Sequence, residues 1–205
     1  MIAYATRTGT RRNLRLLDEA GWRLLLTPDA RWLGDWAGGY ALDNGVWGAH
    51  QQERPWEPGP FLELLRKHGA SADWAVLPDI VAGGAQSLAL SVAWRDRVLA
   101  HSKQVLLAVQ DGMKPADVAQ HLGPRVGVFV GGSTEWKLAT LRQWGEMGQR
   151  LGVWVHVGRV NTVRRILRCV RAGVASIDGT SASRYAKTLP TLDSARRQLA
   201  LGGLG

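Results

Sequence analysis

The sequence predicts an α/β protein, a compact (β/α)8 TIM barrel formed by one domain over residues 1–205. Eight short runs rich in Val, Ile, Leu and Ala are almost continuously apolar, as in parallel strands buried on both faces. Helical patterns separate most of these runs, and this alternation is typical of a barrel. With 205 residues the chain is near the lower limit for that fold. An open doubly wound sheet is the structural alternative, but no GxGxxG follows the first run.

The predicted strands follow one another at regular intervals. They are residues 1–6, 22–28, 40–45, 74–79, 105–112, 125–132, 152–158 and 174–179. In the last of them, "VASIDG", the apolar run ends on Asp178 and a glycine follows. An aspartate is unusual at the end of a buried strand, although Asp-Gly is also ordinary turn chemistry.

The segments between the strands carry helical periodicity or capping residues. Helices are expected over residues 11–21, 59–69, 85–102, 133–152 and 161–173, with a last one over roughly 184–200. Ser133 and Thr134 are good N-caps, and Gly21 is a plausible C-cap residue. Residues 29–39 offer barely one or two helical turns, and residues 48–60, with three prolines, predict a long loop.

Charge and composition indicate which kind of partner and which cellular compartment to expect. The formal net charge of +9 favours a polyanionic partner, nucleic acid first, although an unspecific basic surface is the alternative. The single cysteine, Cys169, excludes an internal disulfide and fits a reducing compartment. Nothing at the amino terminus resembles a signal peptide, and no apolar run reaches about 18 residues. We therefore expect a cytoplasmic protein without a membrane span.

Polar side chains and a pair of glycines with accessible backbone lie at the predicted carboxyl ends of the strands. They are Asp43, Asp79, Gln110, Gly131, Gly132, His156 and Asp178. These ends meet at one mouth of a barrel, where carboxylates can accept hydrogen bonds from the amidine-like edge of a base. Ordinary turn and helix-capping roles are the alternative for Asp43 and Asp79. Only His156 among the histidines ends a strand, so we expect no metal and no cofactor.

Six short motifs occur in an order that resembles a known family. They are "LDNGVW", "LPDI", "AVQDG", "FVGGSTEWK", "HVG" and "SIDGTSASR", spread over residues 40–188. This order is similar to that of the tRNA-guanine transglycosylase superfamily, and closest to its phage-encoded branch, which puts 7-deazaguanines into DNA. The resemblance implies a TIM-barrel enzyme that exchanges bases through a covalent glycosyl-aspartate.

The resemblance also implies roles for individual residues. Asp178 matches the nucleophile and Asp43 the second catalytic aspartate, whose two carboxylates are expected roughly 5 Å apart if the geometry of retaining glycosidases applies. The residues implied to bind the exchanged base are Asp79, Gln110, Gly131, Gly132, Trp47 and Val157, with Trp47 and Val157 on its two faces, and His156 is added as a neighbour. Arg159, Arg184 and Lys187 follow strand ends and are candidates for phosphate contacts, whereas the arginines of residues 164–171 predict a solvated helix face.

Departures from the family pattern favour DNA rather than tRNA as the expected substrate. The cysteine-rich zinc subdomain of the tRNA enzymes is absent, and Asn44 and Val46 differ from the tRNA-enzyme motif. We therefore expect DNA, with its guanine flipped or single-stranded, and a free 7-deazaguanine as partners. We also expect a monomer or weak oligomer, located in the infected host cell if the protein is phage-encoded. Two alternatives stay open: a barrel enzyme for a small nucleoside or sugar-phosphate substrate, for which the Gly131–Thr134 turn could bind phosphate, and a nucleic-acid-binding barrel without catalysis.

Overall fold

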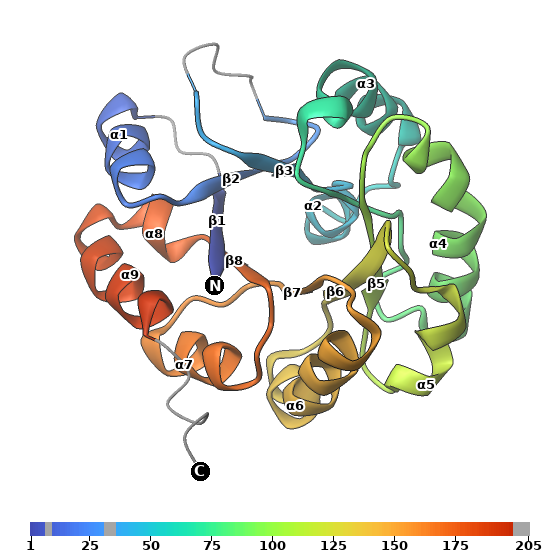
Figure 1. Ribbon diagram of the computed structural model, residues 1–205. Helices are drawn as coiled ribbons and strands as arrows, with labels where there is room; N and C mark the ends of the chain where they lie inside the picture. Colours follow the sequence, from blue (N-terminus) through green and yellow to red (C-terminus); the bar gives the residue numbers. More distant parts are fainter. Residues whose placement is uncertain (7–9, 31–35, 199–205) are drawn as a thin grey trace.

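The computed structural model describes residues 1–6, 10–30 and 36–198 and has eight parallel strands closed into a barrel. Helices surround this barrel (Figure 1). The strands are β1 (Ile2–Thr6), β2 (Arg23–Leu26), β3 (Tyr40–Leu42), β4 (Ala75–Val76), β5 (Val105–Val109), β6 (Val126–Val130), β7 (Val155–Val157) and β8 (Ser176–Gly179). Each lies within a run predicted from the sequence, so the (β/α)8 prediction is confirmed.

The helices follow the strands in the expected alternation. They are α1 (Arg11–Glu19), α2 (Val46–Gln51), α3 (Pro58–His68), α4 (Gly84–Leu99), α5 (Pro115–Val118), α6 (Thr134–Leu151), α7 (Val163–Arg171), α8 (Ser181–Arg184) and α9 (Leu189–Arg197). Ser133 caps α6 as predicted, because its side chain accepts a hydrogen bond from the Trp136 amide. None of the helices in the described ranges has the length and apolar character that a membrane crossing requires.

Three connections differ from the sequence predictions or lie partly outside the described residues. The predicted loop over 48–60 begins inside α2, because Gly45 adopts a φ of +79° and turns the chain directly from β3 into this helix. The last helix begins at Leu189 rather than near residue 184, since α8 and a 3-10 turn over Ala186–Thr188 come first. The short segment predicted over 29–39 includes residues 31–35, which are outside the described residues. The end of the last predicted helix, residues 199–200, is outside them too.

Apolar side chains form two layers, one inside the barrel and one between strands and helices. The inner layer contains Tyr4, Leu25, Ala41, Trp74, Val76, Leu106 and Ala108, with Phe129 and Trp154 packed against it. Neighbouring residues of the same strands, such as Leu107 and Val128, belong to the outer layer. This alternation follows from the two-residue period of a strand. It decides which residues at each strand end point into the mouth.

The first and last strands close the barrel. In the pairing of β1 with β8, Tyr4 lies opposite Asp178 and Ala5 opposite Gly179. At the far end of the interior, the Tyr4 hydroxyl donates to Asp73 Oδ2 at 2.9 Å, and Arg23 pairs with the other oxygen of Asp73 at 2.7 Å. The cluster of Tyr4, Asp73 and Arg23 therefore lies at the amino-terminal end of the strands, and the polar strand ends lie at the opposite end of the barrel.

Close packing of α6 against the end of α7 gives a test of the fold. A Cβ atom on Gly145 would overlap the carbonyl oxygen of Ala172, so Gly145→Ala must push the two segments apart. We expect it to lower the free energy of unfolding by about 1–3 kcal/mol, measured by urea denaturation. Gly59→Ala, where a Cβ meets nothing within 4 Å, is the control and should stay within about 0.5 kcal/mol of the parent. Equal stability of both variants would contradict this packing.

Candidate active site

Four polar side chains from different strand ends gather at the carboxyl end of the barrel. Asp43 follows β3, Asp79 follows β4, Gln110 follows β5, and Asp178 lies in β8. Asp79 accepts from Gln110 Nε2 at 2.6 Å, and its charge and that of Asp178 both act on Asp43. The structure thus brings together these four residues that the sequence singled out.

Asp178 is held by two donors at the end of β8. Its Oδ2 lies 2.9 Å from His156 Nε2, and its Oδ1 accepts from the Arg159 backbone N–H at 3.1 Å. The residue is only 6% exposed. Hydrogen bonds to both oxygens fix the plane of the carboxyl group, while each oxygen keeps a second lone pair for a ligand.

Hydrogen bonds inside the barrel fix the tautomer of His156. Trp154 Nε1 can only donate, and it donates to Ser176 Oγ at 2.8 Å. Ser176 Oγ also lies 2.8 Å from His156 Nδ1, and a hydroxyl can either donate to this nitrogen or accept from it. Burial lowers the pKa of His156, more than Asp178 raises it. A carboxylate oxygen of Asp178 can only accept, so a neutral His156 carries its proton on Nε2 and accepts from Ser176 at Nδ1.

Asp43 has fewer donors and a different electrostatic environment. Burial raises the pKa of Asp43 to about 7; the Gly45 N–H, which donates to Oδ1 at 2.7 Å, opposes this rise, and the charges of Asp178 and Asp79 add to it. A carboxyl group with this pKa exchanges protons near neutrality, which suits a general acid and base. Asp43 and Asp178 therefore differ in their hydrogen-bond partners, with one donor at Asp43 and two at Asp178.

Asp79 and Gln110 form an amide–carboxylate cluster in which one acceptor has no partner. Asn44 Nδ2 donates to Asp79 Oδ1 at 2.8 Å, and Gln110 Nε2 donates to Oδ2. Burial raises the pKa of Asp79, and these two amides oppose the rise. Among the described residues, Gln110 Oε1 is one of two buried side-chain polar atoms without a hydrogen-bond partner. A buried acceptor of this kind is completed by a ligand that donates.

Asn44 is a site residue that sequence reasoning treated only as a departure from a family motif. It is buried, and besides Asp79 its Nδ2 donates to the Leu77 carbonyl at 2.8 Å. Its Oδ1 accepts from the Val46 N–H at the start of α2. One side chain therefore ties the ends of β3 and β4 together. Its place next to Asp43, before a glycine, was the only signal for this role in the sequence.

Arg159 and Trp47 lie against each other above the strand ends. The Arg159 guanidinium lies over the Trp47 ring, 4.3 Å from its centroid, and donates to the Gly132 carbonyl. Arg159 has a φ of +59°, in the left-handed region, and this conformation accompanies the turn that presents its N–H to Asp178. Trp47 keeps 38% of its surface exposed. The Arg159 guanidinium thus already has two partners within the rim, and its phosphate contact stays a prediction.

The two glycines after β6 have different surroundings. Gly132 has a φ of +67°, and a Cβ there would overlap the Asp111 carboxylate, so a side chain is excluded. The Gly131 N–H donates to the Val109 carbonyl at 2.9 Å. Gly131 follows the inward-facing Phe129 by two residues and so lies on the interior side of the strand end. Its backbone borders the same mouth as Gln110.

Val157 does not lie where the resemblance implied. Its side chain belongs to the outer apolar layer and lines a pocket between α6 and α7, while its neighbour His156 points into the barrel, where its ring contacts Trp74. The expected stacking of Val157 on a base is therefore a correction, and the strand period is its physical reason. Arg184 at the end of α8 and Lys187 in the turn after it are exposed. In the described structure neither forms a hydrogen bond with the carboxyl groups of the mouth.

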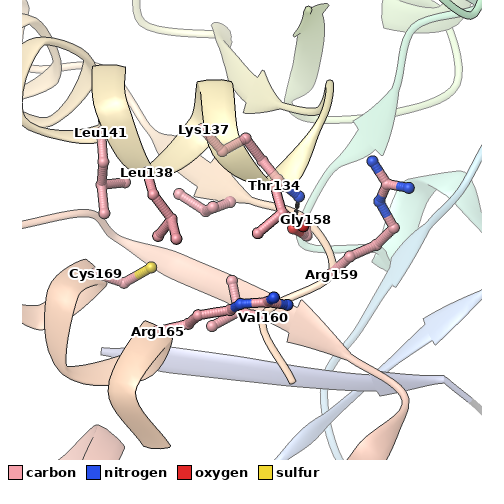
Figure 2. Close-up of a pocket in the computed structure, with 10 residues that line it drawn as sticks. Thr134, Lys137, Leu138, Leu141, Gly158, Arg159, Val160, Arg165 and Cys169 are labelled. Carbon is pink, nitrogen blue, oxygen red and sulfur yellow. Dashed lines mark hydrogen bonds between the residues drawn. The ribbon is translucent and has the colours of Figure 1, made fainter. Parts of the chain in front are cut away.

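Lys137 is a buried cation that the sequence prediction missed. Its Nζ donates to the Gly158 carbonyl at 2.5 Å (Figure 2). Burial lowers the pKa of Lys137 to about 8; Arg159 contributes to the fall, and the charge of Asp178 opposes it. Lys137 therefore supports the turn that holds Asp178. A signal did exist, because Lys137 shares the buried face of α6 with Leu141 and Trp144, at a spacing where an apolar residue is normal.

Comparisons with known proteins add no relative. No protein-family model matches the chain, and no curated protein is detectably similar to it in sequence. Over residues 1–6, 10–30 and 36–198, no three His, Cys, Asp or Glu side chains group as ligands of a metal ion would. The function must therefore be argued from the geometry of the mouth.

The donor chain to Asp178 predicts the protonation of His156. In the parent, 15N NMR of the His156 ring should show a neutral imidazole protonated at Nε2. Ser176→Ala leaves Trp154 Nε1 and His156 Nδ1 without their partner, so we expect a shifted Nδ1 resonance, a proton that stays on Nε2 beside Asp178, and a loss of about 1–3 kcal/mol of stability. Ser183→Ala, at another buried serine, should leave the His156 spectrum unchanged. An Nδ1-protonated ring in the parent would refute this arrangement of hydrogen bonds around His156.

The raised pKa of Asp43 predicts how stability depends on pH. In the unfolded chain Asp43 ionises at its ordinary pKa of 3.8, but in the folded protein it keeps its proton until about pH 7. The folded state binds more protons in this window, so the Asp43 carboxyl makes the free energy of unfolding fall as pH rises. Asp43→Asn should therefore gain up to about 4 kcal/mol relative to the parent between pH 4 and 7.

Urea unfolding at several pH values measures this difference. Asp96→Asn, which changes an exposed carboxylate, is the matched control and should keep a constant offset from the parent. A constant offset for Asp43→Asn as well would mean that Asp43 is not protonated in the folded protein.

Proposed function

We propose that this protein is a base-exchange enzyme that replaces guanine in DNA with a 7-deazaguanine through a covalent glycosyl-aspartate. The observation that carries the proposal is the pair Asp178 and Asp43. Both carboxyl groups belong to one mouth; Asp178 is fixed by two donors, and burial raises the pKa of Asp43 to about 7. Such a pair suits cleavage of a glycosidic bond with retention of configuration.

Recognition of the base rests on the cluster of Asp79 and Gln110. A guanine-like base presents N–H groups and a carbonyl on one edge. The unpartnered Gln110 Oε1 and the Asp79 carboxylate can accept from those N–H groups. The exposed Trp47 ring offers a stacking face for a planar base.

The first half of the reaction forms the covalent intermediate. An Asp178 oxygen attacks C1′ of the deoxyribose as the bond from C1′ to N9 of guanine breaks. The electron pair of that bond goes to the base, and protonated Asp43 supplies the proton that the leaving guanine needs. His156 and the Arg159 N–H hold the attacking carboxylate in position.

The second half reverses these roles with a different base. The incoming 7-deazaguanine gives a proton to the Asp43 carboxylate, and its ring nitrogen attacks C1′. The ester bond to Asp178 breaks, and the carboxylate is restored. Two inversions at C1′ leave the configuration unchanged, and no cofactor is consumed.

DNA must present the guanine outside a base stack for this chemistry. A base within a duplex cannot reach carboxylates recessed at strand ends, so it is flipped out at a few kcal/mol or taken from single-stranded DNA. The net charge of +9 supports a polyanionic substrate. The expected phosphate contacts include the exposed side chains of Arg184 and Lys187.

Replacement of the two aspartates tests the proposal. The parent is incubated with single-stranded or duplex DNA and a free 7-deazaguanine base, and the nucleosides of the DNA are then analysed. We expect the parent to incorporate the base and to form a DNA adduct that survives denaturing electrophoresis. Asp178→Asn should abolish both while it still binds DNA, because only its nucleophile is lost. Asp43→Asn should slow exchange by about 10²–10⁴-fold.

Asp96→Asn is the matched surface control and should exchange at the parent rate. Exchange that persists in Asp178→Asn would refute the assigned nucleophile. A parent that ignores DNA but turns over a free nucleoside would favour the small-substrate alternative, and DNA binding without turnover of either would favour a non-catalytic barrel.

A further inference from the structure

A groove between α6 and α7 is lined by arginines that the proposed chemistry does not use. Its lining residues are Leu138, Thr162, Arg164, Arg165 and Arg168. In the described part of the chain, none of these three arginines forms an ion pair. By contrast, Arg142 on α6 pairs with Glu146 at 2.6 Å. Three uncompensated guanidinium groups around one hollow favour an anionic ligand.

The groove begins at the turn that holds the proposed nucleophile. The backbone N–H groups of Arg159 and Val160 both donate to Asp178, and two residues later Thr162 caps α7. Arg165 lines both this groove and the pocket next to Gly158, and Figure 2 shows it alongside Val160. An anion in the groove would therefore lie outside the barrel rim, beside the strand end that carries Asp178.

The spacing of the arginines suits a chain of phosphates better than a single one. Arg164 and Arg168 are one helical turn apart on the same face of α7, which separates them by about 6 Å along the helix axis. Successive phosphates of an extended strand are separated by a similar distance. The Thr162 hydroxyl accepts from the Arg165 N–H, and its own proton remains available to a phosphate oxygen.

We propose that the α6–α7 groove binds the sugar-phosphate backbone of DNA next to the nucleotide whose base enters the mouth. This inference rests on the proposed function, since it takes DNA as the substrate. It assigns a role to arginines of residues 164–171, for which the sequence predicted only a solvated helix face. Arg164, Arg165 and Arg168 provide the contacts, and the base is selected elsewhere, at Asp79 and Gln110.

The salt dependence of DNA binding tests this groove. A fluorescent single-stranded oligonucleotide is titrated with the parent, with Arg164→Gln/Arg168→Gln, and with a control, Arg150→Gln/Arg171→Gln. The control removes the same charge from exposed arginines at the C-terminal ends of α6 and α7. For the groove variant we expect the slope of log Kd against log salt to be shallower by about 1.4, the value for two lost phosphate contacts on a single strand. The control should keep the parent slope.

The base-exchange assay separates this proposal from the proposed function. We expect the groove variant to need more DNA for half-maximal exchange but to reach the parent rate at saturation, since no catalytic residue has changed. Equal slopes in the groove variant and the control would overturn the groove, even if the parent exchanges bases. A parent that exchanges no base but shows the slope change would overturn the proposed function and leave the groove standing. A parent that binds no oligonucleotide would overturn the groove.

Discussion

Pairing of the first strand with the last is the constraint on which the mouth depends. Asp43 and Asp178 are separated by most of the chain, and only closure of β1 against β8 puts their strand ends on one rim. The register matters as much as the closure. A shift of one residue would turn Asp178 from the interior to the outer layer, because neighbouring residues of a strand point to opposite faces. The same rule places His156 inside and Val157 outside.

Gathering carboxyl groups in a buried mouth is unfavourable, and the protein offsets this differently at each one. Asp178 is stabilised by the His156 ring and a backbone N–H, and Asp79 by two side-chain amides. At Asp43, burial first and then the charges of Asp178 and Asp79 raise the pKa to about 7, and the Gly45 N–H opposes this rise. Burial, donors and neighbouring charges thus give the three carboxyl groups different surroundings.

The turn after β7 connects the inside of the barrel to its outer surface. Arg159 faces inward through its N–H and reaches the Gly132 carbonyl and the Trp47 ring with its side chain. Lys137 holds the same turn from the outer side through the Gly158 carbonyl. Directly beyond it, α7 presents its arginines to the groove. One short segment therefore positions the proposed nucleophile and begins the proposed backbone site, which places base and phosphate contacts next to each other.

The sequence by itself determined the strands, the fold class and the polar residues at the strand ends, because these depend on local apolar runs and turn residues. It could not place α2 or the start of α9, where short helices depend on tertiary contacts. The roles of Asn44 and Lys137, the outward direction of Val157 and the engagement of Arg159 were decided only by the tertiary structure. Each depends on a partner from a distant part of the chain, such as Asp79 for Asn44 and Gly158 for Lys137. Local sequence patterns do not predict such partners, because the contacts form only when the barrel closes.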